Sequence, residues 1–86
     1  MWIVELTFSG APERLAARAA HRDSLAESHG EGVVRMAGPL ADDSGAVLVV
    51  DLPDRPALDR FLAADPYFTT AGVTVDRIRD WRPFLG

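Results

Sequence analysis

Two side chains in this sequence, His21 and Asp65, could together exchange a proton with a substrate. An imidazole moves protons near neutral pH, and a carboxylate beside it orients the ring and favours its charged form. Such a pair suits general acid–base catalysis, for example proton abstraction beside a carbonyl group followed by isomerisation or elimination. The two residues are far apart in the chain, so this chemistry depends on the elements that carry them.

Each member of the pair also has a purely structural interpretation. A lone histidine is more often a surface or half-buried group than a catalytic one. Asp65 precedes Pro66, and an aspartate in that position is a good N-cap, expected to accept a hydrogen bond from the backbone N–H of Phe68. The two roles are compatible, because a capping carboxylate stays ionised and keeps a second oxygen for an imidazole. Tyr67 is more often an amphipathic residue at a core edge than a proton donor.

Further residues could line a pocket around this pair. Arg18 lies three residues before His21, which on a helix places both on one side and suits an anionic substrate, although a solvated arginine is the commoner case. Gly38 and Pro39 predict a turn where a ligand could approach the backbone closely. His29 needs no site, because a cationic side chain at a helix end interacts with the dipole.

The composition excludes several other chemistries. The 86-residue chain has no cysteine and no lysine, which removes disulfides, thiolate ligands, cysteine nucleophiles and Schiff-base lysines. Its net charge is −4, its arginines are scattered and it has no phosphate-binding loop, so we expect no nucleic acid or nucleotide partner. The sequence also lacks a cofactor motif, a convincing metal-ligand spacing and a serine-nucleophile motif. We therefore predict no cofactor and no metal.

Hydrophobic periodicity and turn residues predict the element order β-α-β-β-α-β. Strands are expected at residues 2–8, 32–40, 46–51 and 73–82, helices at 12–29 and 52–64, and a further turn at 67–70. The last strand changes its apolar parity between Val75 and Ile78, which predicts a bulge or an early end. In the first helix, the apolar face is expected around Leu15, Ala19 and Ala26, with His21 at its edge.

This order predicts a single domain over residues 1–86 with a ferredoxin-like α+β sandwich, a four-stranded antiparallel sheet with both helices on one face. The strand at 46–51 is apolar on both sides, with Leu48 and Val50 on one and Val47 and Val49 on the other, as in a strand buried on both faces. The chain offers no third layer. We therefore expect a homodimer in which two copies pack sheet against sheet.

Location and environment follow from the composition and the N-terminal residues. The chain is 48% hydrophobic and 26% charged, as globular proteins are, and it contains no apolar run long enough to span a membrane. Met1 to Glu5 show neither the basic stretch nor the apolar run of a secretion signal. These features predict a cytoplasmic protein with no membrane partner.

Several motifs, taken together and in order, resemble the YCII-related (YciI-like) family across nearly the whole chain. They are Arg14 to His21 with Leu25, Met36 to Pro39, Phe61, Ala64 to Tyr67, and Ala71 to Val73. The resemblance implies a dimeric α+β barrel of ferredoxin-like protomers and a His–Asp pair in an active site. At matching positions the pair is His21 and Asp65, with Arg18 and the Gly38-Pro39 corner lining the same pocket.

This sequence departs from the family pattern in two places. Arg22 follows the histidine where the family commonly has a leucine, which would change the polarity of the pocket. The segment between Pro39 and Gly45 is short, which leaves fewer loop residues to define a substrate.

Three functions stay open. The first is a small acid–base enzyme of isomerase or lyase type acting on a small anionic metabolite, with His21 and Asp65 catalytic and Arg18, Gly38, Pro39 and Tyr67 contacting substrate. The second is a non-catalytic binding or accessory module that holds a small acid, such as a carboxylate, without transforming it. In the third, the dimer itself is the function, and the site residues would tolerate alanine. The sequence does not name the substrate.

Overall fold

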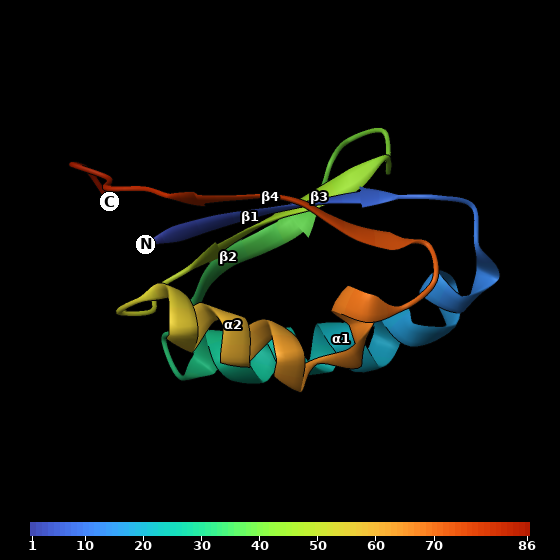
Figure 1. The fold of residues 1–86 in the computed structure, drawn as a ribbon, viewed down its shortest axis with the longest axis horizontal. Helices are drawn as coiled ribbons and strands as arrows, with labels where there is room; N and C mark the ends of the chain where they lie inside the picture. The colour runs from blue at the N-terminus through green and yellow to red at the C-terminus, as the bar shows by residue number, and fades with distance from the viewer.

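The computed structural model describes the whole chain from Met1 to Gly86 and has the predicted element order. The elements are β1 (Trp2–Phe8), α1 (Pro12–Gly30), β2 (Val34–Pro39), β3 (Gly45–Val50), α2 (Arg55–Ala64), the 3₁₀ helix η1 (Pro66–Thr69) and β4 (Val73–Asp80). The strands form one antiparallel sheet in the order β2-β3-β1-β4. Both helices cover the same face of this sheet (Figure 1), which confirms the ferredoxin-like α+β prediction.

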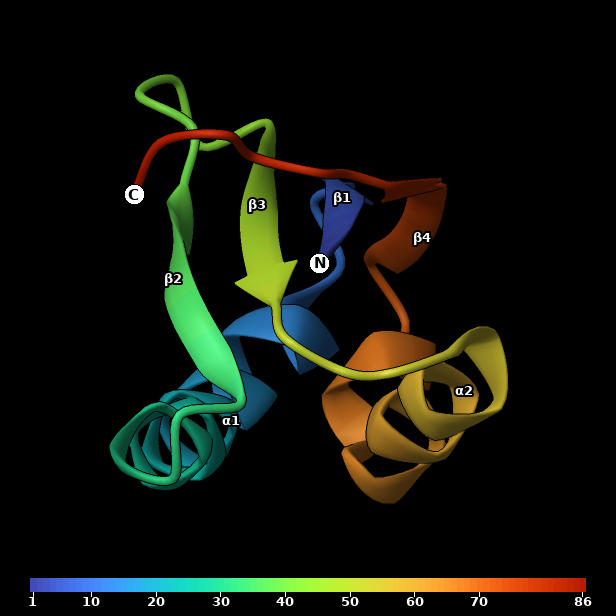
Figure 2. The ribbon, with the colours of Figure 1, turned by 90° about the vertical axis from the view of Figure 1, so that its left-hand side faces the viewer.

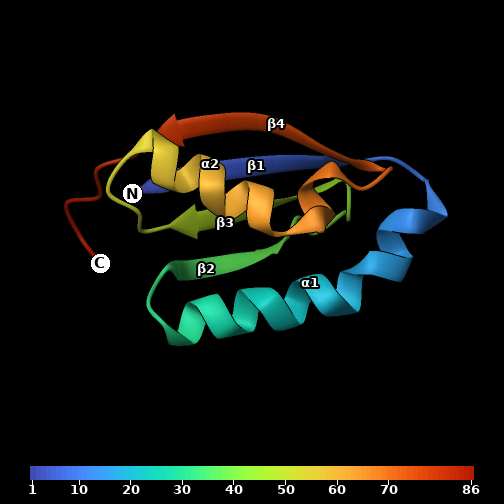
Figure 3. The ribbon, with the colours of Figure 1, turned by 60° about the horizontal axis from the view of Figure 1, so that its bottom comes forward.

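The helices lie beneath different parts of the sheet. Helix α1 runs below β2 and β3, whereas α2 runs below β1 and β4 (Figure 2). The two helices lie side by side and run in opposite directions (Figure 3). This arrangement brings η1, which follows α2, against the middle of α1.

The core lies between the sheet and the helices. Its buried members come from β1, β3, α2 and η1, and they are Val4, Leu6, Leu48, Val50, Leu58, Tyr67 and Phe68. The β1 residues alternate as predicted, because every second side chain of a strand faces the same side of the sheet. Helix α1 contributes no large apolar side chain to this buried set.

A bulge in β4 keeps its apolar side chains on the core face. Glu5 of β1 pairs with Arg77, and the next residue of β1, Leu6, pairs with Val75, so Asp76 is the extra residue. The bulge offsets the parity change in the sequence, so Val75 and Ile78 both pack against the core. The predicted bulge is confirmed, and the strand ends slightly earlier than predicted.

The predicted apolar face of α1 is wrong. Leu15 is 53% exposed, and Ala19 and Ala26 are also exposed, whereas His21 is the one buried residue of the helix. Alanine side chains add little burial energy, so they do not decide which side of a helix packs inward. The helix instead turns its His21 side inward, with Leu25 partly buried beside it.

Local contacts explain two elements that begin later than predicted. Asp54 caps α2, which leaves Leu52 outside the helix, where its carbonyl accepts a hydrogen bond from the Trp2 indole at 3.2 Å. Strand β2 begins only at Val34, because Gly32 adopts a φ of +83° and turns the chain after α1.

A turn stabilised by a carboxylate joins β2 to β3. Asp42 accepts hydrogen bonds from the hydroxyl of Ser44 at 2.6 Å and from its backbone N–H at 3.0 Å. These bonds, the hydroxyl bond above all, lower the pKa of Asp42 below the ordinary 3.8. Because the folded pKa is depressed, this stabilisation is present above the unfolded pKa and is lost as the pH falls through the folded pKa. At Gly45, a Cβ atom would overlap the carbonyl oxygen of Leu6 across the ladder.

The face of the sheet away from the helices mixes apolar and charged residues. Val49 is 7% exposed and Val47 is half-buried. Glu5 forms ion pairs with Arg79 at 3.0 Å and with Arg77 at 3.8 Å. No helix of the chain covers this face, as the sequence indicated (Figure 2). The homodimer through it stays a prediction.

Two leucines provide a test of how α1 and α2 pack. Leu58→Ala should lower the free energy of unfolding by about 2–5 kcal/mol, because Leu58 is 0% exposed and its truncation leaves a cavity. Leu15→Ala is the matched control and should change it by less than about 0.5 kcal/mol. Urea denaturation measures both values. A large loss from Leu15→Ala would mean that α1 packs with the opposite face.

The dimer prediction can be tested on the open face. Val47→Asp should shift sedimentation of the protein toward the monomer, because it adds a carboxylate opposite Glu5 on the surface that two copies would share. Val47→Thr keeps the shape of the side chain and should sediment like the wild type. A wild-type protein that is monomeric at micromolar concentration would contradict the prediction.

Candidate functional site

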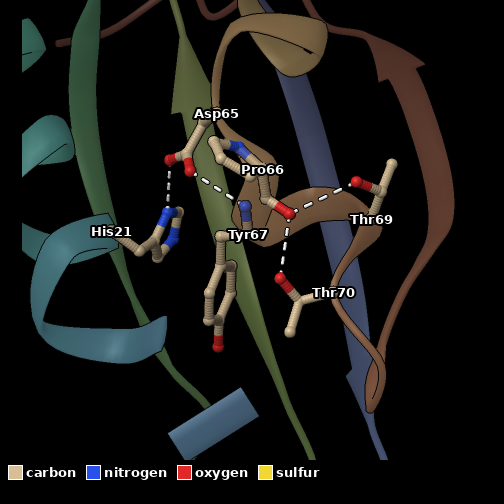
Figure 4. A network of polar contacts seen from close by, with 6 residues as sticks. All are labelled: His21, Asp65, Pro66, Tyr67, Thr69 and Thr70. Atoms are coloured by element: carbon tan, nitrogen blue, oxygen red, sulfur yellow. Dashed lines mark hydrogen bonds and ion pairs between the residues drawn. The ribbon is translucent and has the colours of Figure 1, made fainter. Parts of the chain in front are cut away.

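The fold brings His21 and Asp65 into direct contact. The Nδ1 atom of His21, in the middle of α1, lies 2.6 Å from Oδ2 of Asp65, which stands between α2 and η1 (Figure 4). The contact is mostly shielded from water, with the His21 and Asp65 side chains 8% and 14% exposed. A short bond between an imidazole and a carboxylate in such surroundings is charge-assisted and strong.

Asp65 has this position because the helix must stop there. Pro66 disfavours helical geometry at the preceding residue, and Asp65 has the extended angles φ −112° and ψ 110°. Its Oδ1 atom then accepts a hydrogen bond from the backbone N–H of Tyr67 at 3.0 Å (Figure 4). The sequence-based choice of Phe68 as the donor is wrong, because the Phe68 N–H bonds to the backbone carbonyl of Asp65 at 3.3 Å. Asp65 therefore caps η1 and binds the imidazole with separate oxygens.

The short helix after Asp65 is stabilised by two hydroxyl groups. The carbonyl oxygen of Pro66 accepts hydrogen bonds from Thr70 at 2.9 Å and from Thr69 at 3.3 Å (Figure 4). Both hydroxyls thus add donors to a carbonyl in the first turn of η1. They also hold in place the turn that presents Tyr67 and Phe68 to α1.

Two aromatic rings fix the plane of the imidazole. The Tyr67 ring stacks on it, with centroids 3.8 Å apart and planes 8° from parallel. Phe68 meets the imidazole edge-on, with centroids 5.2 Å apart at 88°. Both contacts arise from the capped turn, so a single local structure supplies the carboxylate and the two rings that orient His21.

The tautomer of His21 follows from its partner. An ionised carboxylate only accepts hydrogen bonds, so Nδ1 carries the proton of the contact. The other ring nitrogen, Nε2, makes no hydrogen bond within the chain. When the ring is neutral, Nε2 has a free lone pair and can accept a proton from a ligand.

A cavity of about 590 Å³ lies beside the imidazole, between α1 and strands β2 and β3. His21 lines it, as do the other candidate residues Arg18, Gly38, Pro39 and Tyr67. Asp65 lies behind the imidazole and lines a smaller cavity, of about 210 Å³, between the two helices. The fold thus places Asp65 against His21 and away from the larger cavity.

Sequence reasoning missed two residues that line this cavity and noted a third only as a departure from the family pattern. It left out Arg14 and Arg35, which both line the cavity. It noted Arg22 as a departure that would change pocket polarity, and Arg22 does line the cavity. The spacing of Arg14, Arg18 and Arg22 at successive turns of a helix is the signal that could have found this side of the site.

His29 has a structural contact. Its Nδ1 atom lies 2.8 Å from the carbonyl oxygen of Val34 and ties the end of α1 to the start of β2. No group of three or more histidine, aspartate or glutamate side chains converges in a way that could hold a metal ion. None of the helices combines the length and the apolar character needed to cross a membrane.

The fold and the site together define a ferredoxin-like α+β domain with a buried His–Asp pair beside a cavity. The model of the YCII-related domain family matches residues 2–82, nearly the whole chain. The chain therefore belongs to the YCII-related family, as its motifs indicated. Comparison with curated proteins finds no significant match.

The double role of Asp65 predicts different costs for two substitutions. Asp65→Ala removes the cap and leaves the Nδ1–H of His21 without an acceptor, so it should lower the free energy of unfolding by about 2–3 kcal/mol. Asp65→Asn keeps an oxygen for the Tyr67 N–H and should cost less than about 1 kcal/mol. Its amide NH₂ would then face Nδ1, so the proton of neutral His21 should move to Nε2. Urea denaturation and nitrogen-15 NMR of the imidazole measure these effects.

Asp54 supplies the matched control. It caps α2 through a 2.8 Å bond from the Ala57 N–H and has no histidine partner, so Asp54→Ala isolates the cost of losing a cap. If Asp65→Ala costs no more than Asp54→Ala, the contact with His21 contributes nothing to stability.

Proposed function

We propose that this protein is a small acid–base enzyme of isomerase or lyase type that acts on a small anionic metabolite. The observation that carries the proposal is the 2.6 Å contact between His21 Nδ1 and Asp65 Oδ2, which leaves Nε2 free on a residue that lines the cavity. The carboxylate and the aromatic rings hold the imidazole in one tautomer and one plane. A general base needs this preorganisation to meet a substrate proton in a productive geometry.

The reaction begins with proton abstraction. Nε2 removes a proton from a carbon beside a carbonyl group, and the electron pair of the C–H bond moves toward the carbonyl oxygen to give an enolate. Asp65 stabilises the imidazolium that forms, because the carboxylate already accepts the Nδ1 hydrogen bond. Return of the proton to a different carbon completes an isomerisation. In an elimination, a leaving group instead departs with its electron pair.

The lining of the cavity supports an anionic organic substrate. Arg18 lies on the same helix as His21 and can bind a carboxylate with its planar fork. Apolar side chains from the sheet, among them Leu6, Phe8 and Leu48, form much of the remaining wall. Such a lining suits a small molecule with a carbon skeleton and a charged end.

The same cavity supports a second function, binding without chemistry. A buried imidazole stacked on Tyr67 can also be a fixed hydrogen-bonding wall for a small acid. The two functions differ in one observable property. Only the enzyme transfers a proton to or from carbon.

A ligand screen followed by isotope exchange distinguishes the two functions. Small carboxylic acids that raise the thermal transition of the wild-type protein identify ligands. Their incubation in heavy water with the protein, followed by proton NMR, should show deuterium uptake at the carbon beside the carbonyl. His21→Gln removes the base, so this exchange should slow by at least about 10²-fold.

His29→Gln is the matched control, because it replaces the other histidine in the lining of this cavity, whose Nδ1 contacts a backbone carbonyl and no carboxylate. Deuterium uptake should continue in this variant. Equal exchange in His21→Gln and wild type would rule out the mechanism. Saturable binding without exchange or any other chemical change would favour the binding module.

A further inference from the structure

We infer that the arginines of α1 form a binding site for a small dicarboxylate, with Arg14 as an anion-binding residue beside Arg18. This inference rests on the proposed function for the location of the ligand, since it uses the same cavity. It narrows the class of ligand from an anion to a molecule with two carboxylates.

The first observation is the position of the arginines. Arg14, Arg18 and Arg22 follow one another at intervals of four residues along α1, and all three line the cavity. Arg35 lines it from β2. Like charges at this spacing repel one another and destabilise a helix. Asp43 is the one carboxylate residue in the lining and Arg35 pairs with Asp51, so the α1 arginines leave the cavity with an excess of positive charge although the chain carries a net charge of −4.

The second observation is that the α1 arginines have no ion pairs. Outside α1, four arginines pair with a carboxylate, including Arg35 of the same cavity; they are Arg35, Arg55, Arg77 and Arg79. Arg60 and Arg82 also lack such a pair, but both lie outside the cavity; Arg18 and Arg22 are exposed as they are, and Arg14 is half-buried. In a chain with more acidic than basic residues, unpaired arginines that share one cavity favour an external anion as their partner.

The third observation concerns Arg14 itself. Its guanidinium carbon lies 4.3 Å from the centroid of the Phe8 ring, a contact that holds the side chain in place before any ligand binds. Its Nε atom is buried and has no hydrogen-bond partner. Its two terminal nitrogens also have no partner within the chain and are not fully buried, so a carboxylate in the cavity would bind across these two donors.

The spacing of the arginines indicates two anionic groups. Side chains one helical turn apart begin about 5–6 Å from each other, comparable with the separation of the carboxylates in a short dicarboxylate. A single carboxylate would leave most of the positive charge in the cavity unbalanced. His21 lies one further turn along the same side of α1 from Arg18, which would bring the carbon skeleton of the ligand toward Nε2.

Calorimetric titration with matched acids tests the inference. The probes are succinate, glutarate, adipate and pimelate, each compared with the monocarboxylate of the same chain length, from butyrate to heptanoate. At least one dicarboxylate should bind the wild-type protein about tenfold more tightly than its monocarboxylate. Arg14→Gln should abolish this preference and leave the affinity for the monocarboxylate nearly unchanged. Arg14→Lys keeps the charge and a long stem over Phe8, so it should retain part of the preference.

Two control variants separate the possible causes. Arg60→Gln makes the same change of net charge on an exposed residue of α2, and the preference should persist. His21→Gln should also retain it, because carboxylate binding does not require the base. If deuterium exchange is absent but the preference for dicarboxylates is present, only the proposed reaction is contradicted. If exchange is present but the preference is absent, only the dicarboxylate site is contradicted.

Three results would overturn the inference. In the first, no dicarboxylate binds the wild-type protein more tightly than its monocarboxylate. In the second, Arg60→Gln reduces the preference as much as Arg14→Gln does, which would mean a general effect of net charge. In the third, Arg14→Lys and Arg14→Gln both fold, as their thermal transitions report, and both keep the full preference.

Discussion

The carboxylate of Asp65 is the group on which the site and much of the helix packing depend. One oxygen accepts the Tyr67 N–H and starts the 3₁₀ turn, and the other binds the imidazole of His21. This 3₁₀ turn also places the Tyr67 ring against the imidazole, where the two rings stack. Because α1 buries His21 and no large apolar side chain, this contact also positions α1 against the core. The same hydrogen bonds therefore serve folding and the proposed chemistry.

Burying the polar pair of His21 and Asp65 has a cost in free energy. A buried polar pair must lose its water, and only good geometry with every hydrogen bond made offsets that loss. An apolar residue at position 21 would pack between Tyr67 and Phe68 without this requirement. The alanine-rich outer side of α1 adds little burial to compensate. A polar residue in the place where a helix would ordinarily bury a leucine is a local inconsistency of the kind expected at functional sites.

The distribution of charge is also locally unfavourable for folding. The protein is acidic overall, yet arginines on α1 gather at one cavity without carboxylate partners. Repulsion within the helix is the result, and a cavity with low-dielectric walls strengthens the field that these charges produce. His21 and these arginines line the same cavity, so an anion bound by the arginines would lie near the imidazole.

The sequence alone determined the element order, the fold class, the family and the identity of the two central residues. Period-two and helical patterns are local, and Pro66 fixes the end of α2 through its own ring, so these features can be derived without a fold. The parity change between Val75 and Ile78 likewise predicted a bulge that the sheet contains.

Only the tertiary structure decided that Asp65 touches His21, that Tyr67 donates to the cap, and that Leu15 faces solvent. Those outcomes depend on how α1 rotates against η1, and alanines specify that rotation weakly, whereas a distant carboxylate and two aromatic rings specify it strongly. Arg14 and Arg35 likewise line one cavity only because β2 lies above α1, and the assembled sheet decides that position.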